Sequence, residues 1–363
     1  MPVHLKKPII DKIAFLLNWN VDPRVDKLEM KAFNRRIKRE IAAGNCEVAH
    51  VKSSRYFTNF RVVLPCGQHA LVQAGAYDTR RNKGGLRIEL NPSRIADDDV
   101  HKLRAVLKRV LDVDDGQLRR LFAHALINRL HVAVDIHGLS LDDVLVDFSI
   151  ARKLTVFAKR IGEGGRVEGY NFGAVSSDYQ TAVYDKRNER VHRALLALQR
   201  SRRSTDVSLK ENRVTQFFKS REAEEHIRAE VRCQKLRGLP VAKVGALRNR
   251  FERFTFVDLR GGREDLDPTT RQAFISMCRD IGAKAAQAHM KNSTQAGEVA
   301  KFWRSRRASW WQPQGLWAQI EGLLRSTRLF PSEAFGDEPT RRSTSLISQR
   351  SYGRQHFPVL TIR

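Results

Sequence analysis

Residues 129–137 place histidine and aspartate side chains at alternate positions of a predicted strand. Because side chains alternate on a strand, His131, Asp135 and His137 share one face with Arg129, and the opposite face is aliphatic. Imidazole nitrogens and carboxylate oxygens bind divalent cations such as Mg²⁺ and Mn²⁺. The segment indicates either a metal site or the ordinary solvated face of an antiparallel sheet.

A second predicted strand, residues 227–233, also carries charges on one face. Arg228, Glu230 and Arg232 follow each other at every second position. Two guanidinium groups beside one carboxylate can bind DNA phosphates, and they can equally form an ion-pair ladder along the sheet. Taken by itself, the pattern favours the ladder.

Tyr184 and Lys186 lie where a predicted strand, residues 180–185, meets a predicted helix, residues 186–199. A phenol has an unperturbed pKa of about 10 and is a poor nucleophile at neutral pH. A nearby ammonium group, a metal ion or a helix N-terminus would favour the phenolate. Asp185 suits the N-cap of that helix. Tyr184 is a candidate nucleophile, or a half-buried strand tyrosine.

The charge of the chain predicts a polyanionic partner. The 363 residues include 66 Lys and Arg against 40 Asp and Glu, a net charge of +26. Residues 186–263 alone hold 21 basic residues against nine acidic ones. The basic run with Arg200, Arg202 and Arg203 lies in a polar break, from which arginines can reach phosphates. We expect DNA as the partner. An anionic membrane is the alternative, but no apolar stretch approaches the ~20 residues that a spanning helix needs.

Tryptophans alternate with arginines in residues 301–311. Arg304, Trp310 and Trp311 could hold single-stranded DNA, since indoles stack on unpaired bases while arginine binds the backbone. The same tryptophans could instead be core residues of a helical subdomain, and helical spacing favours a core position for Trp317.

Other classes of protein are excluded by missing patterns. The four cysteines have no C-x-x-C spacing, so neither a zinc ribbon nor a disulfide framework is expected, and reduced thiols fit a cytoplasmic protein. No G-x-x-x-x-G-K-[ST] motif supports a P-loop ATPase. The basic start of the chain is not followed by the apolar run and cleavage site of a signal peptide.

The order of the predicted strands and helices indicates an α+β fold with a mainly antiparallel sheet and helices on one side. This fold must position the residues described above. A strand at 9–17 and a helix at 27–41 precede a meander of strands at 56–64, 70–74 and 86–90. Helices at 97–111 and 116–126 lead to the strand at 129–136, and a further helix is expected at 141–158. A hairpin at 167–185 follows. The order is compatible with two similar sheet halves.

Composition predicts three parts of the chain. Residues 1–238 form the α+β part, residues 239–328 a helical DNA-binding or accessory part, and residues 329–363 a basic, flexible tail. The first boundary rests on the break at Gly238-Leu239-Pro240.

Taken in order, several segments resemble the rolling-circle replication initiators of filamentous phages, the gene II and gene X replication proteins, and related plasmid initiation factors. The resemblance covers about residues 8–260 and is carried by these landmarks: Leu86–Ser93 with its Asn-Pro-Ser end, Arg129–Asp135, Tyr170–Ser177 followed by Val183–Lys186, Ile227–Arg232, and Leu236–Pro240.

The resemblance implies a metal-dependent endonuclease that nicks one strand at an origin. Tyr184 would attack the DNA, form a 5′-phosphotyrosyl link and leave a free 3′ hydroxyl, with Lys186 assisting. Asp135 and Glu230 would hold Mg²⁺ or Mn²⁺. His131 stands where the family has an acidic residue, so either the metal preference shifts or His137 or Glu89 contributes.

The partners that the resemblance implies are origin DNA, its single-stranded product, and a host helicase and polymerase in a bacterial cytoplasm. Two alternatives keep the same basic segments. One is a replication accessory protein that binds DNA without chemistry, and the other is a relaxase-like mobilisation protein with the same chemistry.

Overall fold

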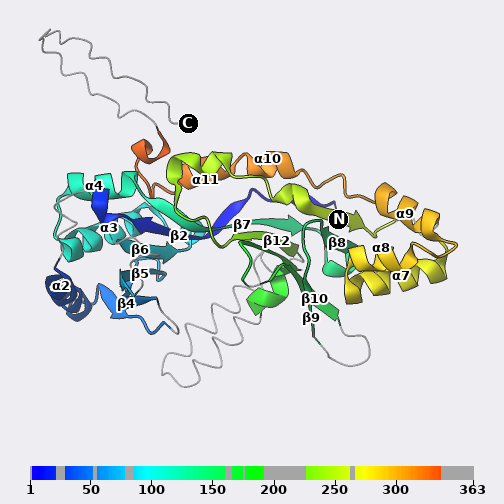
Figure 1. Cartoon of the computed structure of the whole chain (residues 1–363), viewed down its shortest axis with the longest axis horizontal. Helices are drawn as coiled ribbons and strands as arrows, with labels where there is room; N and C mark the ends of the chain where they lie inside the picture. Colours follow the sequence, from blue (N-terminus) through cyan, green and yellow to red (C-terminus); the bar gives the residue numbers. More distant parts are fainter. Residues whose placement is uncertain are drawn as a thin grey trace, which may run out of the picture.

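A 12-stranded antiparallel sheet is the centre of the molecule (Figure 1). A computed structural model of the chain describes residues 2–21, 29–51, 55–77, 85–159, 166–174, 176–191, 226–261 and 266–336. Helices cover one face of the sheet and extend beyond one end of it. The predicted α+β class with antiparallel pairing is confirmed.

Ten strands form the main path of this sheet. In spatial order they are β3 (Cys46–Val48), β4 (Tyr56–Val63), β5 (His69–Ala76), β6 (Leu86–Leu90), β2 (Ile9–Leu17), β7 (Leu126–His137), β12 (His226–Cys233), β11 (Tyr179–Asp185), β10 (Arg166–Phe172) and β9 (Leu154–Lys159). Two short strands, β1 (His4–Leu5) and β13 (Leu239–Pro240), also pair with β7.

The strand order divides the sheet into two halves of the same topology. In each half a first strand pairs with the last strand of a four-stranded meander: β2 with β6, and β7 with β12. The two first strands, β2 and β7, then pair with each other at the centre. The two similar halves expected from the order of the elements are therefore present, with β2 to β6 as half one and β7 with β9 to β12 as half two.

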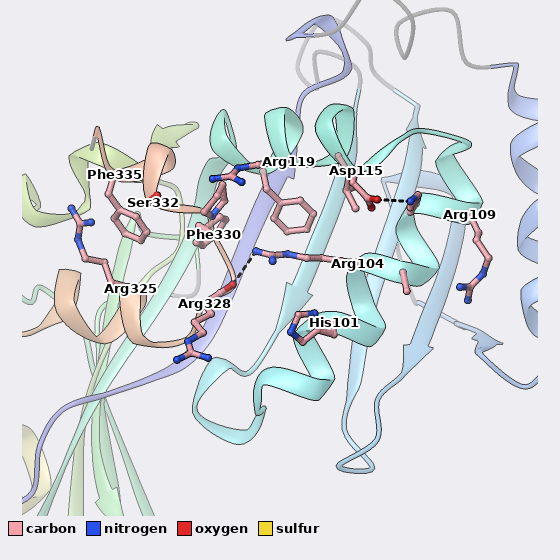
Figure 2. Close-up of a pocket in the computed structure, with 15 residues that line it drawn as sticks. His101, Arg104, Arg109, Asp115, Arg119, Arg325, Arg328, Phe330, Ser332 and Phe335 are labelled. Carbon is pink, nitrogen blue, oxygen red and sulfur yellow. Dashed lines mark hydrogen bonds and ion pairs between the residues drawn. The ribbon is translucent and has the colours of Figure 1, made fainter. Parts of the chain in front are cut away.

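Helices on one face of the sheet bury its aliphatic side. They are α2 (Met30–Ala42), α3 (Asp97–Leu111), α4 (Asp115–Ala123), α10 (Pro313–Trp317) and α11 (Ile320–Ser326). Asp99, in the first turn of α3, accepts the backbone N–H of Ala96 at 2.7 Å, as expected for a carboxylate at a helix N-terminus. Figure 2 shows α3 and α4 beside the segment that follows α11.

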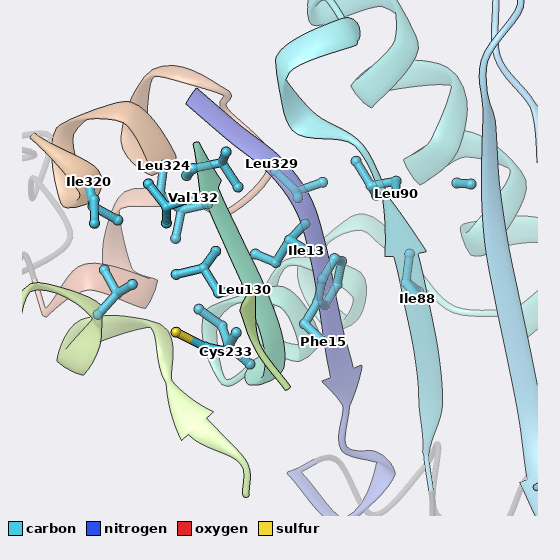
Figure 3. Packing of buried hydrophobic residues seen from close by; sticks show 14 of the residues in the cluster. Ile13, Phe15, Ile88, Leu90, Leu130, Val132, Cys233, Ile320, Leu324 and Leu329 are labelled. Atoms are coloured by element: carbon cyan, nitrogen blue, oxygen red, sulfur yellow. The ribbon is translucent and has the colours of Figure 1, made fainter. Parts of the chain in front are cut away.

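The core follows the period-2 pattern of the central strands. Leu130 and Val132 of β7 and Ile13 and Phe15 of β2 are fully buried or nearly so, and they pack with Leu324 of α11 (Figure 3). Apolar side chains on one face of a strand drive this packing because their burial removes them from water. The opposite face of the same strands carries the polar residues, His131 and Asp135 among them, together with a few apolar ones.

The prediction of a helix at residues 141–158 is wrong. Ser140 precedes a short 3₁₀ helix, η3 (Leu141–Asp143), and the chain then forms β8 (Val144–Phe148) and β9. β8 pairs with β14 (Phe254–Asp258) in a separate two-stranded sheet. Valines alternating with other residues favour a strand once a partner is available, and that partner lies more than a hundred residues away.

The C-terminal part is mainly helical but contains the unexpected strand β14. Helices α7 (Pro268–Ile281), α8 (Ala283–Met290) and α9 (Ala296–Ser305) pack around a second hydrophobic cluster with Leu145 and Val257. The main core nevertheless continues past the expected boundary at residue 239, since it includes Val241 and Trp317. No helix in the described ranges has the length and apolar character required to cross a membrane.

Residues 329–336 do not belong to a flexible tail, which corrects the boundary expected at 328. Leu329 is fully buried and Phe330 is 4% exposed. Phe330 contacts Phe15 edge-on, with ring centroids 4.9 Å apart. Apolar side chains at the start of a basic segment therefore anchor it to the sheet. Residues 337–363 lie outside the described part of the chain.

Candidate active site

Three functional candidates lie in one row across the centre of half two. In the strand register, Tyr184 of β11 pairs with Arg228 of β12, and Arg228 pairs with Asp135 of β7. Paired residues in an antiparallel sheet point to the same face, and this is the face opposite the helices. The sheet thus brings together a phenol, a guanidinium and a carboxylate from three segments.

Arg228 is the most buried charge of this row. Its side chain is 3% exposed and forms a two-point ion pair with Asp135, with Nε and Nη2 donating to the two carboxylate oxygens at 2.5 and 2.8 Å. Nη1 lies 3.4 Å from the carboxylate of Asp11 on β2. Burial would raise the pKa of Asp135, but the Arg228 guanidinium lowers it below its ordinary value.

A second polar row lies beside the first. Nδ1 of His131 is 3.2 Å from Glu230, and Arg232 donates to the other oxygen of Glu230 at 2.8 Å. Burial would raise the pKa of Glu230, whereas its bonds to His131 and Arg232 lower it to about 2. Glu230 therefore orients the His131 ring and neutralises Arg232.

The candidate metal ligands do not form a divalent-cation site in this arrangement. Asp135 is held by Arg228, and Glu230 is held by His131 and Arg232. Within the described ranges, no group of three His, Cys, Asp or Glu side chains converges as cation ligands. The one open ligand atom of the second row is Nε2 of His131, which is buried without a hydrogen-bond partner among the described residues.

The Tyr184 phenol lies in a half-buried position that disfavours its ionised form. Burial raises the pKa of Tyr184, and the negative charge of Glu230 raises it further, against the smaller opposing effect of Arg228. The sequence left Tyr184 as a candidate nucleophile or a half-buried strand tyrosine; the side chain is half-buried, and the nucleophilic role stays a prediction. Gly169 of β10 pairs with Tyr184, and a Cβ atom at Gly169 would lie only 2.9 Å from that of Tyr184.

Lys186 is buried next to the phenol. Its ammonium is 5.5 Å from the centre of the Tyr184 ring and donates to Glu189 at 2.5 Å. Burial and the charge of Arg228 lower the pKa of Lys186. Asp185 caps the helix at 186–191 by accepting the N–H of Asn188 at 2.9 Å, as the sequence predicted. This helix start fixes the position of Lys186.

Among the described residues, the predicted DNA-binding arginines do not all lie together. Arg200, Arg202 and Arg203 lie outside the described residues. Arg304 is exposed on α9. Arg228 and Arg232 belong to the two polar rows and are already bound to carboxylates.

The tryptophans pack within the protein. Trp303 and Trp317 are each 7% exposed, which confirms a core position for Trp317. Trp310 and Trp311 are half-buried against the main core. The Trp310 N–H donates to Asp258 at 3.2 Å and the Trp311 N–H to the carbonyl of Phe251 at 3.3 Å. Stacking of bases on either indole stays a prediction.

Two features of the site were missed in the sequence. Asp11 interrupts the apolar strand β2, at a register shift between residues 10 and 12, and so approaches Arg228. His4, His137 and His226 stack across β1, β7 and β12, with ring centroids 5.1 and 4.6 Å apart. A polar residue inside an apolar strand was the available signal for Asp11.

The chain was compared with family models, curated proteins and solved structures. No family model matches the chain, and the search of curated proteins found no match. Among solved structures, the chain is similar to a rolling-circle replication initiator protein from Geobacillus stearothermophilus, with 18% sequence identity over 74% of this chain and 91% of that one. The TM-score of 0.35 does not establish a common family.

Proposed function

We propose that the protein initiates rolling-circle replication by nicking one DNA strand with Tyr184. The observation that carries the proposal is the row of Tyr184, Arg228 and Asp135 at the centre of the sheet's polar face. A nucleophile beside fixed cations suits attack on a phosphodiester, because the cations stabilise the charge that develops on the phosphate oxygens. The charge of +26 supports DNA as the substrate.

The proposed step exchanges one phosphate ester for another. The Tyr184 oxygen bonds to the phosphorus while the bond from phosphorus to the 3′ oxygen breaks. The phenol loses its proton, and the released 3′ oxygen gains one. The products are a 5′-phosphotyrosyl link and a 3′ hydroxyl from which a host polymerase can extend, with a host helicase unwinding the duplex.

Metal dependence is a separate prediction from the family resemblance. Mg²⁺ or Mn²⁺ would supply Lewis-acid stabilisation of the phosphate when bound. The ion pairs of Asp135 and Glu230 must open before either carboxylate can serve as a ligand. His131 and His137 are the other candidates, and imidazole nitrogens favour Mn²⁺ over Mg²⁺. Nicking measured with each cation, and with neither, tests this requirement.

The function is tested by incubating the protein with supercoiled DNA that carries the element's own origin. The wild type should convert it to the nicked form, and denaturing gels should show protein attached to the 5′ side of the nick. Tyr184→Phe should bind DNA normally but not nick, because it keeps the ring and loses only the oxygen. Tyr179→Phe, on the same strand, is the matched control and should nick normally.

A second candidate is a DNA-binding accessory protein without chemistry. The raised pKa of Tyr184 and the closed ion pairs favour it. In that case wild-type protein would bind DNA with a steep salt dependence and form neither nick nor adduct. A nick that survives Tyr184→Phe would instead point to another nucleophile, such as Tyr179 or Tyr170.

A further inference from the structure

A basic cavity of about 1060 Å³ lies on the helix-covered side of the sheet (Figure 2). It opens between α3, α4 and the segment 325–335. Phe122 and Phe330 form part of its wall and pack on Phe15 of the apolar face. The cavity is therefore separate from the candidate active site, which lies on the polar face.

Most cations that line the cavity are paired with carboxylates. The pairs are Lys108 with Asp115 at 2.7 Å, Arg109 with Glu40 at 2.7 Å, Arg119 with Glu333 at 2.5 Å, Arg325 with Glu321 at 2.9 Å, and Arg328 with Asp97. Several of these side chains are largely exposed, including Arg119 at 61% and Arg328 at 73%. Exposed pairs of this kind are weak and exchange readily for another anion.

Arg104 differs from its neighbours. Its Nη2 donates to the carbonyl oxygens of Arg328 at 2.9 Å and Leu329 at 3.2 Å, and Figure 2 shows the side chain extended into the cavity. No carboxylate of the described residues lies within ion-pair distance of it. Burial lowers the pKa of Arg104, and the charge of Arg119 lowers it further. A half-buried guanidinium without a counter-ion is costly, and an anion would offset that cost.

We propose that this cavity binds a phosphate group, with Arg104 as its anchor and Arg119 and Arg328 at its mouth. Arginine presents a planar fork of donors that matches two phosphate oxygens. The phosphate belongs either to the DNA backbone or to a small phosphorylated compound, and the chemistry of recognition is the same. The site goes beyond the proposed nicking function and does not depend on Tyr184.

Thermal unfolding in sodium phosphate, compared with sodium chloride at equal ionic strength, tests the site directly. A ligand that binds only the folded state raises the melting temperature. Wild-type protein should be stabilised by phosphate, and Arg104→Gln should lose that response. Arg35→Gln removes the same charge from an exposed position on α2 and should keep it. Arg119→Gln changes an exposed residue, should fold normally and should weaken the response even if Arg104→Gln does not fold.

Binding of random-sequence duplex DNA at several salt concentrations identifies the source of the phosphate. If the backbone occupies the cavity, Arg104→Gln should reduce the slope of log affinity against log salt by about 0.9, the value for one phosphate contact. An unchanged slope together with a lost phosphate response would assign the site to a small phosphorylated compound. The proposal is overturned if phosphate stabilises the wild type, Arg104→Gln and Arg119→Gln equally, or stabilises none of them.

Discussion

The two halves of the sheet share a topology, but the residue that the third meander strand places beside an arginine of the fourth strand differs between them. In half two, Tyr184 of β11 neighbours Arg228 of β12. In half one, Gln73 of β5 neighbours Arg87 of β6, and the two side chains are hydrogen-bonded at 2.5 Å. Only half two therefore offers a nucleophile at this position.

The arginines also differ in how they are neutralised. Arg228 pairs across strands with Asp135, whereas Arg87 pairs with Glu89 on its own strand, because its neighbour on β2 is Leu16. The Arg228 side chain is 3% exposed and that of Arg87 is 15% exposed. Half one therefore has an ion-pair network with a structural role, whereas half two has a similar network next to a phenol.

Replacing Arg228 or Arg87 by alanine should give the largest difference in folding stability between the two halves. Arg228→Ala removes a fully buried guanidinium, leaves the half-buried Asp135 without its partner, and should lower the free energy of unfolding by about 3–5 kcal/mol. Arg87→Ala removes a more exposed group and should cost about 1–3 kcal/mol. Urea denaturation at pH 7 measures both. Equal costs for the two variants would contradict the distinction between the halves.

The dependence of folding stability on acid should also differ between the two halves, by a smaller amount. Glu230 has an ordinary pKa of 4.5 that is lowered to about 2 in the folded protein, so it stabilises the fold above pH 4.5. That contribution, about 3 kcal/mol, is lost as the pH falls from 4.5 to 2. Glu230→Gln should flatten the fall in stability over this window. Glu89→Gln, in half one, should flatten it less, and a larger effect there would reverse the comparison.

The smallest effect is expected from a change in the packing next to Tyr184. Gly169→Ala would bring a methyl group within 2.9 Å of the Tyr184 Cβ and should displace the phenol. Nicking should slow by about 10- to 100-fold with little change in DNA affinity, since a displaced nucleophile loses its alignment. Gly297→Ala, in α9, meets nothing within 4 Å and serves as the matched control. An unchanged rate for Gly169→Ala would mean that the position of Tyr184 does not limit the reaction.

Local patterns predicted most of the sheet. The alternation of Leu130 and Val132 with His131 assigned the two faces of β7, and the acidic run at 97–99 marked the start of α3. The prediction failed at β8, whose pairing with β14 depends on distant residues. Periodicity is a local signal, so it cannot supply a partner that folding brings in from elsewhere.

Tyr184, Arg228 and Asp135 were candidates from the sequence alone, but the sequence did not show which of them contact one another. Arg228 and Asp135 are 93 positions apart, and only the register of β7 with β12 decides that they pair. The same register leaves Glu230 to His131 and Arg232. Desolvation also comes from the packed structure, which is why the raised pKa of Tyr184 was not foreseen. The cavity at Arg104 is formed by α3, α4 and the chain after α11, and no local motif marks it.

The most direct measurement is to find the residue that becomes joined to DNA. Supercoiled origin DNA is incubated with wild-type protein, the covalent adduct is isolated under denaturing conditions, nuclease-trimmed and proteolysed, and its peptides are sequenced by mass spectrometry. We predict a nucleotide attached through its 5′ phosphate to Tyr184, and no adduct from Tyr184→Phe. A nick without an adduct, or an adduct on a different tyrosine such as Tyr56 in half one, would contradict the account.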